Sequence, residues 1–216
     1  MIIVKIVECS NDKLPNNLLG EMFNTDLDKS SIKLGEYTTP SDKKVVFYNY
    51  MDNKLILSVS NDIVVSVISL NKVDATTRVL QDLKSTPYQV VKVYTMRDYR
   101  GQGITTKAYE LAITNSIARK KAICIQSGVH QTYSIARVWN KLAINSATSN
   151  FEVNIIDKGA LRYKSDGTVA TYKGMVVPDK NTWSLFPDKD IWSIYPDAYK
   201  KDTFLVLRQK TQGILL

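Results

Sequence analysis

The chain has 216 residues, of which 44% are hydrophobic and 23% are charged. This composition excludes wholesale disorder and provides enough apolar sequence to bury a sizeable core. The formal net charge of +8 favours anionic partners such as nucleotides, nucleic acid or acidic proteins.

Cysteine and histidine usage points to a reducing compartment and to no metal. Cys9 and Cys124 lie far apart in apolar segments, which favours buried thiols over a disulfide framework. One histidine without paired Cys/His spacing makes a zinc site unexpected. The first apolar run is too short for a secretory signal, and no run approaches the roughly 20 apolar residues that span a bilayer. We therefore expect a cytoplasmic protein without a membrane partner; the asparagine-, lysine- and tyrosine-rich composition would suit a bacterial or phage-infected cell.

The first third of the chain predicts strands around one helical segment. Residues 2–8 read as a strand, 11–31 as one or two short helices, and 33–44 as a polar loop. Three strand-like runs follow, with Asn- and Asp-containing breaks that are typical of tight turns: 45–50, 55–60 and 63–70. They predict an antiparallel meander. Residues 71–87 carry mixed signals, with a brief helix indicated near Val79, Leu80 and Leu83.

The middle of the chain alternates between strands and helices. A strand over 88–96 breaks into a basic, glycine-containing turn at 97–103, and a helix begins near Ile104. The apolar face of this helix is formed by Ile104, Ala108, Leu111, Ala112 and Ile117. A short strand at 122–126 and an amphipathic helix over 135–143 follow, with Thr132 or Ser134 as its N-cap. This succession predicts a local parallel strand pair covered by helices.

The last third predicts a strand at 151–157, a hairpin around Asp166-Gly167 and a final strand at 203–208. Between the last two, the segment from Trp183 to Asp188 recurs nine residues later, from Trp192 to Asp197. Two copies are too few for a solenoid. These aromatics either dock on the domain surface or form a wall facing a substrate.

The turn at 97–103 can bind an anion. Backbone N–H groups at a helix start have no intrahelical acceptor, and the helix dipole adds partial positive charge. Gly101 and Gly103 let the main chain approach phosphate oxygens closely, and Arg100 adds a formal charge. The turn is neither a P-loop, since no Gly-Lys-Ser/Thr ends it, nor a dinucleotide fingerprint. A glycine turn without a ligand is the alternative.

The segment Arg100-Gly101-Gln102-Gly103-Ile104-Thr105 resembles the pyrophosphate motif of the GNAT superfamily of acetyl-CoA-dependent N-acetyltransferases. Arg100 and Gly103 match the pattern, whereas Thr105 replaces its final small residue. Residues 2–157 and 203–208 also follow the order of elements in that family. The resemblance implies an α/β (α+β) fold with a mixed, mostly antiparallel central sheet, a local parallel splayed pair and flanking helices.

The resemblance also implies where the donor lies. Residues 1–216 would form one GNAT-like domain, with 158–202 inserted as a candidate substrate lid. The diphosphate of acetyl-CoA would bind the six motif residues, and its pantetheine arm would follow the backbone of Val93, Tyr94 and Thr95. No metal is implied.

Catalysis in that family needs a base to deprotonate the amine and can use an acid to protonate the thiolate. Trp139 occupies the position where the resemblance implies a tyrosine acid, and tryptophan cannot serve. Tyr133 and His130 are the substitutes, although a helix-start aromatic can simply pack and a loop histidine can simply be solvated. Cys124 reads as core, and Asp98 or Glu110 as surface charge or as groups acting through water.

The implied function is direct acetyl transfer from acetyl-CoA to an amine of a protein or small molecule. One alternative keeps the fold as a catalytically weak or inactive acyl-CoA-binding or protein-interaction module. A second is a nucleic-acid-binding protein that stacks bases on Trp183, Trp192 and Tyr195. The scattered basic charges argue against nucleic acid as a partner.

Overall fold

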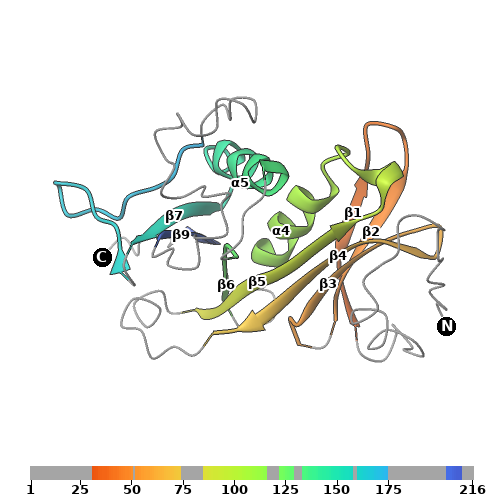
Figure 1. Ribbon diagram of the computed structural model, residues 1–216, viewed down its shortest axis with the longest axis horizontal. Coiled ribbons are helices and arrows are strands. Elements are labelled where there is room, and N and C mark those ends of the chain that lie inside the picture. The colour runs from red at the N-terminus through yellow and green to blue at the C-terminus, as the bar shows by residue number, and fades with distance from the viewer. Residues whose placement is uncertain are drawn as a thin grey trace. The chain divides into compact units, whose positions relative to one another are not determined.

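The structure is a computed structural model in which residues 31–50, 52–73, 85–115, 122–128, 133–157, 160–174 and 203–210 are described (Figure 1). The chain divides into two compact units. The first comprises Met1–Asn71 and Val91–Ala112, and the second comprises Lys72–Val90 and Ile113–Leu216. Strand β5 (Thr86–Thr95) and helix α4 (Ile104–Thr114) each contribute residues to both units.

Four antiparallel strands open the described part of the first unit: β1 (Ser31–Thr38), β2 (Lys44–Tyr50), β3 (Leu55–Ser60) and β4 (Ile63–Lys72). The predicted meander is confirmed. The turn between β2 and β3 uses Asp52 and Asn53, and the turn between β3 and β4 uses Asn61 and Asp62, all with φ between 49° and 72°. Asn and Asp tolerate this left-handed conformation better than most residues, which fixes the turns and hence the strand register.

The predicted loop at 33–44 is wrong, because half of it is the edge strand β1, Lys44 begins β2, and only residues 39–43 connect the two strands. Within this strand Leu34 is the one residue that is buried, and a bulge interrupts the pairing between Lys33 and Gly35. The clean apolar alternation that would identify a strand is therefore missing. Polar and charged residues on an edge strand also protect the sheet from pairing with other chains.

The core of the first unit lies on both faces of the meander. One cluster contains only buried residues from β2, β3 and β4: Tyr50, Leu55, Leu57, Val59, Val64 and Val67. Every residue of β3 is buried. Because successive side chains of a strand point to opposite faces, this pattern shows that both faces are covered.

Helix α4 begins at Ile104 as predicted, and Figure 1 shows it running alongside β5. Its buried residues are Ile104, Ala108, Tyr109, Ala112 and Ile113. The predicted apolar face is therefore rotated slightly, since Leu111 is half-buried and packs 3.1 Å from the Cβ position of Gly35. Ile117 lies outside the described residues.

In the second unit, the amino-terminal half of β5 pairs in parallel with β6 (Ile123–Gln126). The strand order continues through β9 (Thr203–Gln209), β7 (Phe151–Asp157) and β8 (Ala160–Leu161), and these pairings are antiparallel. The predicted strands at 122–126, 151–157 and 203–208 and the local parallel pair are confirmed. The fold class is thus a mixed, mostly antiparallel sheet with helices.

Helix α5 (Tyr133–Asn145) confirms the second amphipathic helix. It starts one residue before Ser134, so Ser134 lies within the helix and is not its N-cap. The buried residues of α5 are Ala136, Trp139, Asn140, Leu142 and Ala143.

The segment at 158–202, predicted as an insertion, begins as part of the sheet. Ala160 and Leu161 pair with β7, and the chain then turns at Gly167, where φ is 79°. Tyr172 returns to bond β7 through its N–H and Asn140 of α5 through its hydroxyl, at 2.7 and 2.6 Å. The predicted hairpin around Asp166-Gly167 is confirmed, and a lid formed by the rest of the segment stays a prediction.

Several predictions fall outside the described residues. They are the strand at 2–8, the helices over 11–31 apart from Ser31, the brief helix near 79–83, the thiol of Cys9 and the aromatic copies at 183–197. The single-domain organisation also stays a prediction. None of the described helices has the length and apolar character needed to cross a bilayer.

Candidate functional site

The candidate site is the strand–turn–helix junction of the first unit. Strand β5 ends at Thr95, the 3-10 helix η1 (Arg97–Tyr99) follows, and α4 begins at Ile104. The N–H of Met96 bonds the carbonyl of Val65 in β4 at 2.9 Å, and the N–H of Tyr99 bonds the carbonyl of Met96 at 2.9 Å. The junction is therefore anchored to the meander immediately after β5 ends.

The two glycines of the turn have different roles. Both are left-handed, with φ of 74° at Gly101 and 77° at Gly103. A Cβ atom at Gly103 would lie 3.0 Å from the hydroxyl oxygen of Tyr37, closer than side chains normally pack, whereas one at Gly101 would meet no atom within 4 Å. Gly103 is thus required by the fold itself, and the open space beside Gly101 is where a ligand can approach the main chain.

Helix α4 presents its first N–H groups at this turn. The first intrahelical bond of the helix runs from the N–H of Lys107 to the carbonyl of Gly103, at 3.0 Å. The N–H groups of Ile104, Thr105 and Thr106 therefore have no carbonyl acceptor within the helix. Ile104 is buried, and it anchors the start of the helix in the core. The helix dipole adds partial positive charge there.

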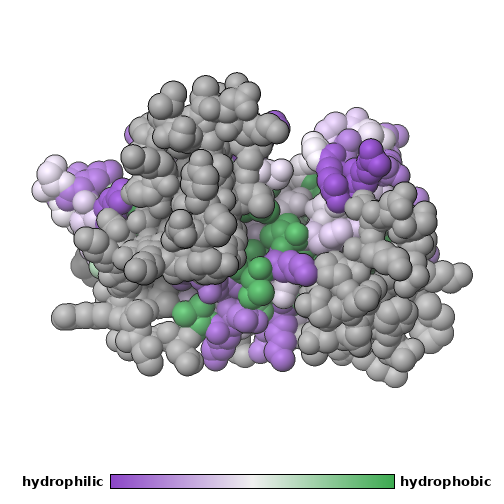
Figure 2. Space-filling view, in the orientation of Figure 1, coloured by the Kyte–Doolittle hydropathy of each residue, from purple (hydrophilic) through white to green (hydrophobic). Residues whose placement is uncertain are grey.

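Basic side chains lie around the turn. Arg100 is exposed, and its Nε donates to the carbonyl of Thr95 at 2.9 Å, which holds the guanidinium beside the strand end. The ammonium of Lys43 donates to the carbonyl of Asp98 at 3.2 Å and lies 4.2 Å from the centre of the Tyr99 ring. Figure 2 shows a hydrophilic surface at the upper right, where Figure 1 places the connection between β1 and β2 that carries Lys43.

Tyr37 and Lys43 were missed by sequence reasoning. The Tyr37 hydroxyl donates to the carbonyl of Gln102 at 3.1 Å, so β1 holds the middle of the turn. Both residues are more than 50 positions away from the turn and fall in the segment predicted as a loop. Only a prediction of the edge strand β1 could have indicated them.

The predicted pantetheine edge is partly occupied by bonds within the unit. Val93, Tyr94 and Thr95 are all half-buried. The carbonyl of Tyr94 accepts from the Ser66 hydroxyl at 2.8 Å, and the carbonyl of Thr95 accepts from Arg100. A carbonyl has two lone pairs, so these bonds leave acceptor capacity, but they also fix the orientation of the strand backbone.

No family model and no curated protein matches this sequence. A solved structure that resembles this one is that of Arabidopsis thaliana Naa50 in complex with the bisubstrate analogue CoA-Ac-MVNAL. The two chains share 15% sequence identity with a TM-score of 0.29, and the match covers 74% of this chain and 82% of the other.

The nine predicted donor-binding residues lie on one continuous stretch of the first unit: Val93, Tyr94, Thr95, Arg100, Gly101, Gln102, Gly103, Ile104 and Thr105. The predicted catalytic residues do not belong to that unit. Tyr133 is the first residue of α5 in the second unit, and His130 lies outside the described residues. Their roles stay predictions.

Two further second-unit residues have a clear structural role. Trp139 is fully buried in the face of α5 that packs inward. Cys124 is buried in β6, and burial raises the pKa of its thiol, which disfavours the reactive thiolate. The prediction that Cys124 is a core residue is confirmed.

Proposed function

We propose that this protein is an acetyl-CoA-dependent N-acetyltransferase. The observation that carries the proposal is the turn from Arg100 to Gly103, where two left-handed glycines lead into the first N–H groups of α4, which have no acceptor within the helix. This is the geometry that accepts a diphosphate, and it occurs in the segment that resembles the pyrophosphate motif of the N-acetyltransferases.

In the proposed complex, the N–H groups of Ile104, Thr105 and Thr106 donate to the diphosphate oxygens. Arg100 supplies a formal positive charge next to them. Gly101 has no side chain to obstruct the diphosphate, and the space beside it is open. The acyl-pantetheine arm then follows the backbone of β5 from Thr95 towards Val93.

The proposed reaction is direct transfer. The nitrogen of a neutral amine attacks the thioester carbonyl carbon, the carbon–sulfur bond breaks, and the nitrogen releases one proton to solvent, which gives the acetylated amine and CoA thiolate. His130 is the proposed base that takes the proton of the ammonium, and Tyr133 is the proposed acid that protonates the thiolate. The acceptor is an amine of a protein or of a small molecule.

The donor site is tested by a matched pair of glycine variants. Gly101→Ala and Gly167→Ala replace glycines with φ of 74° and 79° whose Cβ positions are both open, so each introduces the same backbone strain of about 1–2 kcal/mol. We expect Gly101→Ala to raise the Kd for acetyl-CoA at least about tenfold in calorimetry, because the new methyl group obstructs the diphosphate. Gly167→Ala should bind like the wild type. Equal affinity of all three folded proteins would contradict the site.

Transfer itself is tested by thiol release from acetyl-CoA in the presence of amines, peptides and a cell extract. We expect at least one acceptor to stimulate release. With that acceptor, His130→Gln and Tyr133→Phe should lower the turnover by about 10²-fold or more while leaving the Kd for acetyl-CoA unchanged. Clear donor binding without stimulation by any acceptor would instead favour the catalytically inactive acyl-CoA-binding module.

A further inference from the structure

Three hydroxyl groups form a continuous chain beneath the candidate site. The Ser66 hydroxyl in β4 is fully buried and lies 2.9 Å from the Thr95 hydroxyl at the end of β5. The Thr95 hydroxyl in turn lies 3.2 Å from the Thr105 hydroxyl in the first turn of α4. Two strands and the helix are thereby connected through side chains within the first unit.

The direction of the protons in this chain is determined by its buried end. The Ser66 hydroxyl donates its single proton to the carbonyl of Tyr94, at 2.8 Å, because a carbonyl can only accept. Ser66 must then accept from Thr95, and Thr95 must accept from Thr105. All three protons point away from the helix start, so Thr105 faces a ligand with its backbone N–H and not with a hydroxyl proton.

Thr95 is the centre of this arrangement. Its hydroxyl accepts from Thr105, and its carbonyl accepts from the Nε of Arg100 at 2.9 Å. These two partners are the first and last residues of the segment from Arg100 to Thr105. One residue at the strand end therefore fixes both ends of the proposed diphosphate-binding loop.

We infer that Ser66, Thr95 and Thr105 are positioning residues for the acyl-CoA donor. The inference rests on the proposed function and assigns a role to the residue at which this chain departs from the family pattern. A glycine or alanine at position 105 would lack the hydroxyl, and the first turn of α4 would lose its side-chain bond to β5. The hydroxyl chain holds the first N–H groups of α4, and the carbonyl of Thr95 holds Arg100, in the geometry that a diphosphate requires.

The test compares substitutions that differ by one hydroxyl. Thr105→Val keeps the β-branched shape and a similar helix propensity but removes the hydroxyl, whereas Thr105→Ser keeps the hydroxyl. In calorimetry, Thr105→Val should raise the Kd for acetyl-CoA about five- to tenfold, the effect of one lost hydrogen bond. Thr105→Ser should stay within about twofold of the wild type.

A second pair separates positioning from general stability. Ser66→Ala and Ser60→Ala each remove a buried serine hydroxyl that donates to a backbone carbonyl at 2.8 Å. Both should lower the urea midpoint of unfolding, Ser66→Ala the more because it also removes the acceptor of the Thr95 hydroxyl. Only Ser66→Ala should weaken acetyl-CoA binding.

The outcomes distinguish the positioning role from the proposed function. If Thr105→Val bound acetyl-CoA as tightly as the wild type, the positioning role would be overturned. The same would follow if Thr105→Ser lost as much affinity as Thr105→Val. Either result would leave the proposed function standing. Equal binding by Ser66→Ala and Ser60→Ala would also overturn the positioning role. A wild-type protein that does not bind acetyl-CoA would overturn the proposed function, and this inference with it.

Discussion

At the scale of single residues, Gly103 and Tyr37 constrain each other. The left-handed backbone at Gly103 disfavours any other residue, and the Tyr37 hydroxyl oxygen lies 3.0 Å from the position a Cβ would take. The ring carbon that carries this hydroxyl is 3.8 Å away, which is ordinary contact. The steric conflict at position 103 therefore involves one oxygen atom.

A double-mutant cycle follows from this geometry. Gly103→Ala should destabilise the protein by about 1–2 kcal/mol through backbone strain, plus the cost of displacing Tyr37. Tyr37→Phe should cost about 1 kcal/mol through the lost bond to Gln102. In the Tyr37→Phe background the added Cβ has room, so Gly103→Ala should cost less than in the wild type. Urea unfolding of the four proteins measures this coupling, and strict additivity would contradict it.

At the scale of the elements, the sequence predicts those strands and helices that have strong local signals. The strand β3 contains four aliphatic residues among its six, its turns use Asn and Asp, and α4 follows a glycine turn. These patterns are local, so they identify the meander and the junction without tertiary information.

The elements that the sequence does not predict depend on distant partners. Strand β1 has one buried residue, Leu34, and is defined by its pairing with β2. The hydroxyl chain links Ser66 to Thr105 across 39 positions, and no local pattern indicates that these side chains meet. The strand–turn–helix junction that carries the six motif residues could thus be predicted, whereas the contacts that Tyr37 and Ser66 make with it could not.

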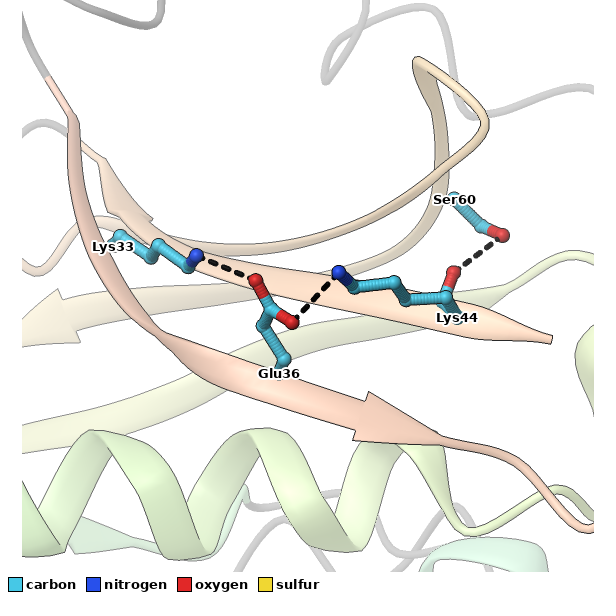
Figure 3. A network of polar contacts seen from close by, with 4 residues as sticks. All are labelled: Lys33, Glu36, Lys44 and Ser60. Atoms are coloured by element: carbon cyan, nitrogen blue, oxygen red, sulfur yellow. Dashed lines mark hydrogen bonds and ion pairs between the residues drawn. The ribbon is translucent and has the colours of Figure 1, made fainter. Parts of the chain in front are cut away.

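The edge pair β1–β2 carries a charge network that makes its stability depend on pH (Figure 3). Glu36 lies 2.6 Å from the ammonium of Lys33 and 2.9 Å from that of Lys44. Hydrogen bonds from Lys33 and then Lys44 lower the pKa of Glu36 to about 2. The carboxylate is exposed, so the network responds to the solvent directly.

The sign of the pH dependence follows from this depressed pKa. The stabilisation is complete above the pKa of about 4.3 for an unfolded glutamate and is lost as the pH falls towards about 2. We expect the urea midpoint of Glu36→Gln to decline less than that of the wild type between about pH 5 and pH 2. Lys33→Gln should fall between them, because Lys44 remains. Parallel declines of the wild type and Glu36→Gln would show that the network does not contribute.

At the scale of the whole molecule, the net charge of +8 acts on any anionic ligand. Acetyl-CoA carries several negative charges, so part of its binding energy should be long-range and screened by salt. The described basic residues are spread over both units, with Arg100 at the candidate site and Lys164 in the hairpin of the second unit. Removing either side-chain charge lowers the net charge by one.

A comparison of these two residues separates the site from the general field. Arg100→Gln should raise the Kd for acetyl-CoA about tenfold and reduce its salt dependence, because it removes a charge next to the diphosphate. Lys164→Gln should change the Kd by less than about twofold, since an exposed charge elsewhere is largely screened. Calorimetry between about 50 and 500 mM NaCl measures both effects. Equal effects of the two substitutions would contradict a localised site.

The same titration decides between a small-molecule donor and nucleic acid. A chain that binds nucleic acid through many distributed phosphate contacts loses affinity steeply with salt, in proportion to the number of contacts. A diphosphate held mainly by backbone N–H groups and one arginine should show a much shallower dependence. We therefore expect a single-stranded oligonucleotide not to displace acetyl-CoA at about 150 mM salt. The nucleic-acid-binding alternative would be favoured if the oligonucleotide displaced acetyl-CoA at that salt, if its affinity fell steeply with salt, and if substitutions of scattered lysines abolished its binding. Only distributed phosphate contacts combine these properties.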